Sequence, residues 1–254
     1  MNKLYLLLFV SLIVFSCKKD TENTNAYGTK LVKMTTERIF EEGPSNFYEY
    51  VYHYNEKGQI VEIENTDSNG LSYFYVYEGE NLIERTWVKN KNNTVYKKDS
   101  LEYYAGTNNI TIQYYFYYGS NNPLTHIYYF IYDEQNQMVE KITYEMSEQD
   151  TSSIEKYYWE NGNIIKNEVY DNKGKLTFEK SMEYDDKKNY QYIYPSVNPY
   201  SKTQNNMLRY NWADYLGGVD LDCNPCQYYY QYNLAGYPLK INFEGESIST
   251  LYYE

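Results

Sequence analysis

Aromatic and polar residues alternate along much of the chain in a pattern that predicts β-strands. Every second position from Tyr48 to Tyr54 is a tyrosine, and the alternate positions hold Phe47, Glu49, Val51 and His53. Successive side chains of a strand point to opposite faces, so the four tyrosines share one face. The runs from Tyr73 to Tyr77 and from Tyr228 to Tyr232 repeat this alternation.

Each tyrosine-rich run ends at an acidic or amide residue, passes through a short turn and continues as an apolar run. Asn55 begins such a turn, and Gly58 supplies the positive φ that hairpins need. We expect Asp133, Asp171 and Asp185 to form Asx turns rather than to bind calcium, because no Asp-rich loop has the spacing of a calcium site.

The same unit recurs about seven times and predicts the architecture. Equivalent positions are spaced by 23, 27, 28, 27 and 25 residues, which fits one hairpin per unit, at Tyr54, Tyr77, Tyr104, Tyr132, Trp159 and Tyr184. A propeller blade needs a period of about 40–50 residues. We therefore predict an all-β fold, an antiparallel meander of about seven β-hairpins in a wide, twisted, largely single-layer sheet. Tyrosine rings would cover one face and keep their hydroxyls in water.

The repeat is interrupted between Tyr184 and Tyr232, which lie 48 residues apart. We assign an irregular or helical insertion to residues 190–227. Its first part holds two prolines, whereas Ser201 to Leu216 shows near-helical spacing of apolar residues and is followed by glycine, so we expect one helix there. Irregular segments on a rigid scaffold often carry function, and this segment is the place where we expect it.

The N-terminus predicts export and lipidation. Residues 1–16 form a signal peptide, in which Lys3 precedes an apolar stretch that is shorter than the roughly 20 residues needed to span a bilayer. The end of this stretch resembles a bacterial lipobox, which predicts lipidation of Cys17; a plain signal peptide is the alternative. Residues 17–28 would form a flexible tether, and residues 29–254 the sheet domain.

Charge and targeting narrow the expected partners. The residues from Lys18 to Asp20 resemble the tag that directs lipoproteins of Bacteroidota to the cell surface. We expect an outer-membrane lipoprotein at the cell surface, with a periplasm-facing one as the alternative.

Removing residues 1–16 changes the formal charge from −12 to −13, since 22 basic and 35 acidic residues remain. Nucleic acid is not an expected partner, because binding phosphate requires clustered Lys and Arg. Membrane attachment would come from lipid on Cys17.

Two further cysteines, Cys223 and Cys226, form the sequence CNPC. In an oxidising compartment this pair could be a local disulfide, a redox motif or half of a metal site. The disulfide is favoured, because the motif abuts a tyrosine-rich strand rather than a helix start and both histidines, His53 and His126, are distant in sequence. No metal and no cofactor are expected.

The hairpin units resemble a known repeat. The segments YVYHYNEKGQIVEI, FIYDEQNQMVEKITYE and VYDNKGKLTFEKSMEYDDKKN are similar to the YD (RHS-type) repeats of bacterial surface and toxin-shell proteins. Over about residues 30–254 the chain most resembles tyrosine-rich lipoproteins of Bacteroidota that are classed as domains of unknown function. The resemblance implies fold rather than activity, and it assigns no catalytic residue.

Candidate ligand-binding residues gather in the insertion, next to the cysteine pair. They are Trp212, Asp214, Tyr215, Asp220 and Asp222. Paired carboxylates such as Glu62 and Glu64 are expected on a solvated sheet face rather than across a glycosidase cleft. Ser100, between Asp99 and Leu101, resembles the acceptor for O-glycosylation in exported proteins of Bacteroidota.

The sequence therefore predicts a non-catalytic envelope lipoprotein that binds an extracellular glycan, peptide or partner protein through its aromatic sheet face or its insertion. A structural or assembly role in the envelope is the first alternative. A polysaccharide hydrolase is the second. The oligomeric state cannot be read from the sequence.

Overall fold

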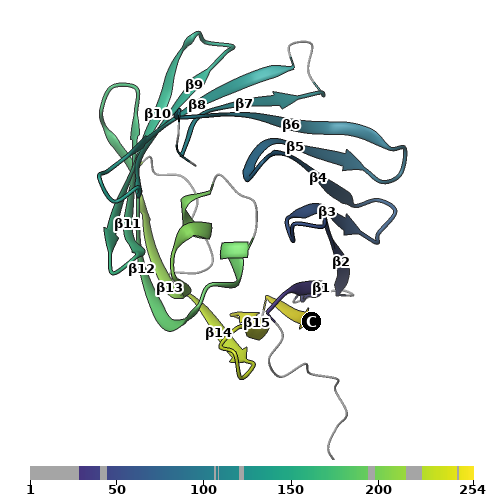
Figure 1. Cartoon of the computed structure of the whole chain (residues 1–254). Coiled ribbons are helices and arrows are strands. Elements are labelled where there is room, and N and C mark those ends of the chain that lie inside the picture. The colour runs from purple at the N-terminus through teal and green to yellow at the C-terminus, as the bar shows by residue number, and fades with distance from the viewer. Residues whose placement is uncertain are drawn as a thin grey trace, which may run out of the picture.

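The computed structural model describes residues 29–40, 45–105, 107, 109–119, 123–193, 198–215, 225–244 and 246–254. These residues form a closed antiparallel β-barrel in which neighbouring strands follow chain order and β1 pairs with β16 (Figure 1). The predicted open, single-layer sheet is therefore wrong. The described strands leave no free sheet edge, so pairing of edge strands between chains is not available to them.

The wall consists of 16 described strands, with two short 3-10 helices, η1 and η2, between β12 and β13. Their bounds are β1 Leu31–Arg38, β2 Asn46–Tyr54, β3 Ile60–Asn65, β4 Leu71–Glu78, β5 Asn81–Lys89, β6 Thr94–Tyr103, β7 Ile110–Tyr117, β8 Leu124–Tyr132, β9 Met138–Glu145, β10 Asp150–Glu160, β11 Asn163–Asp171, β12 Leu176–Lys188, η1 Tyr190–Ile193, η2 Pro199–Lys202, β13 Asn205–Asp214, β14 Cys226–Tyr232, β15 Pro238–Phe243 and β16 Ser247–Tyr253.

The two ends of the domain close the wall. The pairing of β1 with β16 begins at Leu31, which lies opposite Tyr253, and ends at Arg38, which lies opposite Ser247. The backbone N–H groups of Thr29 and Lys30 both donate to the carbonyl of Glu254. Each strand pair adds a right-handed twist of roughly 20–25°, and closing the sheet satisfies the hydrogen-bonding groups that an edge would expose. The hairpin repeat specifies the local pairs, whereas closure depends on residues more than 200 positions apart.

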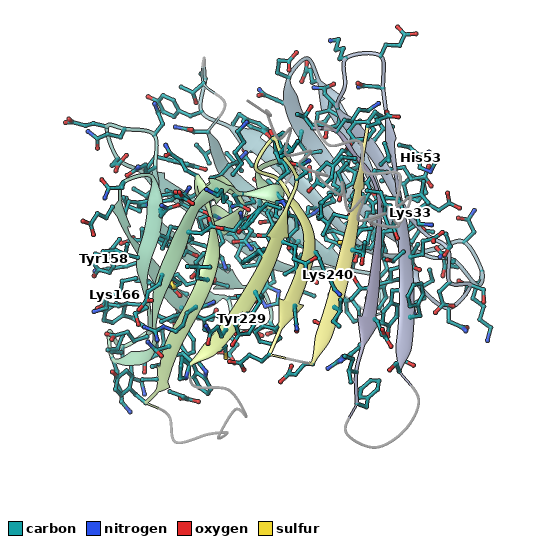
Figure 2. The ribbon with its side chains drawn as sticks, turned by 90° about the horizontal axis from the view of Figure 1, so that it is seen from below. Lys33, His53, Tyr158, Lys166, Tyr229 and Lys240 are labelled. Carbon is teal, nitrogen blue, oxygen red and sulfur yellow. The ribbon has the colours of Figure 1, made fainter. Side chains whose placement is uncertain are left out.

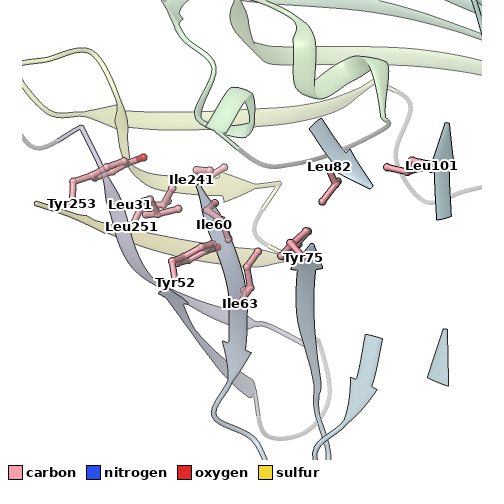
Figure 3. Packing of buried hydrophobic residues seen from close by; sticks show 10 residues of the cluster. All are labelled: Leu31, Tyr52, Ile60, Ile63, Tyr75, Leu82, Leu101, Ile241, Leu251 and Tyr253. Atoms are coloured by element: carbon pink, nitrogen blue, oxygen red, sulfur yellow. The ribbon is translucent and has the colours of Figure 1, made fainter. Parts of the chain in front are cut away.

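The tyrosine-rich face of the strands is turned into the barrel. Tyr52, Tyr75 and Tyr253 are buried there among aliphatic residues, in a cluster that spans strands from both halves of the chain (Figure 3). A second cluster contains Phe130, Tyr157, Ile164 and Met182. The expectation that tyrosine hydroxyls on the sheet face remain in water is wrong for most of these rings, because the sheet curls around them.

One aromatic residue in each hairpin bonds back to the preceding hairpin. A register shift stands immediately before this residue in the six hairpins from β2–β3 to β12–β13, for example before Tyr54, Tyr77 and Tyr103. The side chain then reaches a backbone carbonyl at the start of the neighbouring strand. We call this contact the clasp; a tyrosine makes it with its hydroxyl and Trp159 with its indole N–H. Examples are Tyr54 to Leu31 (2.5 Å), Tyr77 to Ile60 (2.9 Å), Tyr103 to Leu82 (2.6 Å), Trp159 to Met138 (2.8 Å) and Tyr184 to Ile164 (2.8 Å). Tyr132 makes the equivalent bond to the backbone of Ile110. In the hairpin of β14 and β15 the shift precedes Tyr232, whereas Tyr230 bonds to the carbonyl of Met207.

One clasp crosses a weak junction of the wall. β4 and β5 pair along their whole length within one hairpin, whereas β3 and β4 pair only through Glu62 with Phe74 and Ile63 with Tyr73. Tyr77 spans this second junction, since it lies on β4 and bonds to β3. This clasp thus adds a hydrogen bond where the ladder between two hairpins is short.

The predicted Asx turns are confirmed. The Asp133 carboxylate accepts backbone N–H bonds from Gln135 and Gln137, and Asp171 accepts them from Lys173 and Lys175. The Asp185 carboxylate likewise accepts the N–H of Lys187 at 2.9 Å. Short polar side chains fix the chain reversal in this way.

The predicted helix from Ser201 to Leu216 is wrong. Residues 205–214 form wall strand β13, and η2 supplies the helical turn that precedes it. Met207, Tyr210 and Trp212 face the lumen opposite Tyr184, Met182 and Lys180 of β12. A register shift between Glu183 and Tyr184 spaces these inward residues unevenly, which imitates helical periodicity in the sequence. The segment with η1 and η2 lies inside the barrel (Figure 1).

We expect Tyr103→Phe to lower the free energy of unfolding by about 1 kcal/mol, because it removes a side-chain hydrogen bond and leaves the Leu82 carbonyl with one partner fewer. Tyr104→Phe is the matched control, since Tyr104 is 65% exposed. Urea unfolding followed by circular dichroism measures both. Equal changes in the free energy of unfolding for the two substitutions would contradict a stabilising role of the clasp.

Candidate functional site

The two faces of the wall differ in chemistry. Tyrosines such as Tyr50 and Tyr52 point inward, so the residues that alternate with them point outward. Figure 2 shows outward side chains around the wall, labelled at Lys33, His53, Tyr158, Lys166, Tyr229 and Lys240.

The outer face carries ion pairs at the centres of its strands. Lys33 pairs with Glu49, Lys98 with Glu84 at 2.6 Å, and Lys166 with both Glu168 and Glu179 at 2.7 and 2.9 Å. Hydrogen bonds from Lys166, Tyr158 and Tyr170 lower the pKa of Glu168 to about 2. A charged side chain on the lipid face of a membrane barrel costs about 2–4 kcal/mol at the bilayer midplane.

Outward apolar residues occur on several strands, for example Val76 on β4, Tyr158 on β10 and Tyr252 on β16, which are 48%, 41% and 45% exposed. Tyr129 and Ile131 of β8 are 39% and 45% exposed, and Ile112 and Ile142 flank them on β7 and β9. On β3 and β12 the outward positions instead hold Glu62, Glu64, Glu179 and Glu183. A membrane barrel needs an apolar band around its whole circumference. No helix among the described residues is long and apolar enough to cross a bilayer.

The middle of the lumen holds a connected belt of charged and aromatic side chains. We call it the lumen belt and define it as Arg85, Lys97, Asp99, Tyr115, His126, Tyr128, Lys141, Glu155, Tyr157, Lys180, Tyr200 and Tyr210. Contacts connect the members from Lys97 on β6 to Tyr210 on β13, and the pair of Arg85 and Asp99 shares the inner face of the wall with Lys97. His126 stacks on Tyr128, for example, with 8° between the ring planes.

The two carboxylates of the lumen belt are already paired. Asp99 is fully buried and accepts two bonds from the guanidinium of Arg85. Burial raises the pKa of Asp99, and Arg85 opposes that rise. Glu155 accepts a bond from Lys141 at 2.5 Å and another from the Tyr157 hydroxyl at 2.6 Å.

Lys180 differs from the other cations of the belt. Its ammonium lies 3.8 Å from the ring centroid of Tyr210 and 5.2 Å from that of Tyr200, and no carboxylate of the described residues forms an ion pair with it. Burial lowers the pKa of Lys180 to about 8. The aromatic faces partly replace the water that a buried ammonium loses.

The insertion folds into the lumen around three polar side chains. The Asn189 amide donates to Tyr200 and twice to Thr203, and the Asn206 amide donates to Asp185 and to the carbonyl of Lys188. Asn189, Thr203 and Asn206 are all buried. The Tyr232 hydroxyl donates to Asp185, which ties this network to β14. Residues 198–206 of the insertion are therefore fixed within the lumen by these bonds.

A cavity of about 520 Å³ lies where η2 meets the hairpin turns, and we call it the mouth pocket. Four clasp aromatics line it, namely Tyr77, Tyr103, Tyr132 and Trp159. Amide side chains surround these rings, from Asn81, Asn109, Asn136, Gln137 and Gln204. Pro199 and Lys202 of η2 form the insertion's side of the cavity. Its volume is that of a small-molecule site, which is typically about 300–1,000 Å³.

The predicted insertion residues are not gathered into one site. Trp212 faces the lumen and stacks on Phe178 at a centroid distance of 6.0 Å, and Asp214 ends β13 opposite Phe178. Tyr215 is exposed just beyond that strand. Asp220 and Asp222 lie outside the described residues.

The other predicted residues have mixed outcomes. Cys226 is fully buried and disulfide-bonded, while its predicted partner Cys223, the signal peptide, Cys17 and the tether lie outside the described residues. Ser100 lies at the middle of β6, between buried Asp99 and Leu101. Its glycosylation stays a prediction. No group of three or more His, Cys, Asp or Glu in the described part of the chain could hold a metal ion.

Two features of the lumen were missed by sequence reasoning. The amide rim of the mouth pocket comes from turn residues such as Asn109 and Asn136, which the repeat marks as turn formers. Lys180 lies in FEKSMEY, where its alternation with Glu179 and Ser181 could have placed it on the tyrosine side. Its lack of a partner depends on closure and could not be read from the sequence.

Comparison with known proteins shows the fold alone. No family model matches the chain, and no curated protein matches it. A solved porin-like protein from Bacteroides uniformis is similar with 11% identity and a TM-score of 0.57, over 89% of this chain and 99% of that chain. A porin-like protein from Bacteroides vulgatus has 12% identity and a TM-score of 0.40, over 89% of this chain and 99% of that chain.

A third similar structure is a TcdB2-TccC3-Cdc42 complex, with 11% identity and a TM-score of 0.38, over 81% of this chain and 12% of that chain. These last two scores are too low to support an argument. The resemblance to YD repeats is thus not confirmed.

We expect Lys180→Met to raise the free energy of unfolding at pH 7 by about 1–2 kcal/mol, because relief of the burial cost exceeds the loss of the ring contacts. The unfolded chain binds this proton more tightly than the folded chain. Lys180 therefore destabilises the fold fully below pH 8, and its effect fades as pH rises from about 8 towards 10.5.

Urea unfolding of wild type and Lys180→Met at pH 7 and pH 9.5 measures this difference, and the tyrosine titrations common to both proteins cancel. The advantage of the variant should shrink at the higher pH. A less stable variant at pH 7 would show that the ring contacts outweigh desolvation.

Proposed function

We propose that this protein is a non-catalytic envelope lipoprotein whose barrel stands in water and binds a carbohydrate in the mouth pocket. The observation that carries the proposal is the pocket itself, in which aromatic rings are surrounded by amide side chains. Aromatic faces pack against the C–H faces of sugars, and amides supply both hydrogen-bond donors and acceptors to hydroxyl groups.

The outer face supports a water-facing barrel over a membrane-spanning one. Mid-strand ion pairs such as Lys98 with Glu84 would be costly against lipid, whereas they are ordinary in water. The similar fold from Bacteroides uniformis is called porin-like, but that likeness concerns the path of the chain and not the chemistry of the wall. Attachment would then come from the predicted lipid on Cys17, at the cell surface or facing the periplasm.

If the predicted tether anchors the protein, the mouth pocket lies near the membrane. Residues 29 and 30 lie beside Glu254, at the end of the barrel that also carries the hairpin turns lining the pocket. A tether over residues 17–28 extends at most about 40 Å. A saccharide chain attached to the same surface could therefore reach this end of the barrel.

Anchoring is tested with Cys17→Ala. We expect wild type in the membrane pellet and the variant in the soluble fraction, because the charged wall contributes no bilayer insertion. Immunoblots of fractionated cells measure the partition. A variant that still pellets and resists alkaline extraction would mean that the wall itself lies in the bilayer, and a soluble wild type would refute lipidation.

Carbohydrate binding is tested with the Cys17→Ala protein on a glycan array, followed by calorimetry on the sugars that bind. In that background, combining Asn109→Ala with Gln204→Ala should weaken binding about 10-fold or more, since two hydrogen-bonding groups leave the rim. Both side chains belong to turns or the insertion, so the wall is unchanged.

Asn92→Ala is the control for this experiment. Asn92 is an exposed amide in the turn between β5 and β6, at the opposite end of the barrel from the mouth pocket. Its removal should leave affinity unchanged. An array without any bound sugar, or equal affinity of the rim variant and wild type, would overturn the proposal.

A further inference from the structure

The lumen belt carries more positive than negative charge, although the whole chain has a formal charge of −12. Its cations are Arg85, Lys97, Lys141 and Lys180, and its carboxylates are Asp99 and Glu155. A belt with more cations than carboxylates raises the local concentration of anions beside it.

Three of the four cations have polar partners. Arg85 bonds to Asp99, Lys141 bonds to Glu155, and Lys97 bonds to the Tyr115 hydroxyl, a bond that raises the pKa of Lys97. Among the described residues, Lys180 contacts the faces of Tyr200 and Tyr210 and forms no ion pair. Two other lumen-side carboxylates, Glu145 and Asp214, stand at the ends of their strands, and neither forms an ion pair with Lys180.

We propose that Lys180 binds the carboxylate of an acidic sugar, in a lumen subsite separated from the mouth pocket by η2. Pro199 and Lys202 of η2 line the mouth pocket, whereas Tyr200 between them contacts Lys180 and packs edge-on against Tyr157. The proposal rests on the proposed function in taking a saccharide as the ligand. It adds the class of that saccharide, a uronate.

The surroundings of Lys180 fit a uronate better than a simple anion. Tyr200 and Tyr210 already lie close to the ammonium, so a sugar whose carboxylate reaches Lys180 brings its ring against aromatic surface. A carboxylate also supplies the opposite charge that a partly desolvated ammonium lacks. An inorganic anion would gain the attraction to the ammonium but no packing against the aromatic rings.

The pH dependence follows from the groups around Lys180. Its own pKa is lowered by burial, so the ammonium loses its proton as pH rises above about 8. The facing tyrosines, Tyr157, Tyr200 and Tyr210, have pKa values raised by burial and stay neutral over that range. Glu155, the nearest paired carboxylate of the belt, is held by Lys141 and Tyr157. Affinity for a uronate should therefore fall between pH 7 and pH 9.5.

The experiment compares acidic oligosaccharides with their carboxyl-reduced counterparts, using calorimetry at pH 7 on the Cys17→Ala protein. The probes are trimers of galacturonate, glucuronate and mannuronate. At least one acidic trimer should bind 10-fold or more tightly than its reduced counterpart. Lys180→Met should bind both forms equally, and Lys180→Arg should retain the preference. Circular dichroism verifies that each variant is folded.

The rim variant with Asn109→Ala and Gln204→Ala separates this inference from the proposed function. It should weaken binding of both forms while leaving the ratio of their affinities unchanged. Equal binding of acidic and reduced trimers by wild type, a preference that survives Lys180→Met, or no binding of any acidic trimer would each overturn the inference. Neutral sugars bound on the array and lost in the rim variant would then still support the mouth pocket.

Discussion

The constraint on which the structure depends is the clasp. In each even-numbered strand from β2 to β12, one aromatic residue bonds to the backbone of the preceding strand. A wall of sixteen strands encloses a space too wide for aliphatic side chains alone to fill. Tyrosine is long enough to reach inward and still find a polar partner, as Tyr103 does at the carbonyl of Leu82. The register shift before each such residue turns its ring into the lumen and toward the neighbouring strand. One side chain thereby fills space and joins two hairpins.

This use of aromatic residues sets the character of both faces of the wall. Because tyrosines occupy the inner face, the alternating positions fall outside, where Lys98 with Glu84 and Lys166 with Glu179 form pairs suited to water. These pairs support the proposed water-facing wall, because a membrane barrel has an apolar exterior and a polar channel. The insertion completes the interior, since Asn189 and Asn206 satisfy its backbone within the lumen. The mouth pocket remains where this insertion and the clasp aromatics meet.

Local features of the fold were predictable because they are encoded locally. Alternating tyrosines define strands, and an acidic or amide residue followed by glycine defines the turns, as Asp171 and Gly174 do. Closure was not predictable, because it joins Leu31 to Tyr253 through a pairing that no nearby residue specifies. The repeat was also misaligned at one unit, where Tyr103 makes the clasp and the neighbouring Tyr104 is exposed. A one-residue shift exchanges the two faces of a strand, so the error concerned which ring enters the lumen.

The candidate site was harder to predict, because its members become neighbours only in the closed barrel. Lys180 looks like one more charged residue of an amphipathic strand, yet it is placed among rings where a neutral side chain would cost less. Met182, two residues further along the same face, shows that this part of the lumen accepts an unbranched apolar side chain. Folding alone therefore gives no reason for a lysine at this position. A buried cation kept at a cost to stability, between two aromatic rings in the lumen, is the pattern expected of a binding residue.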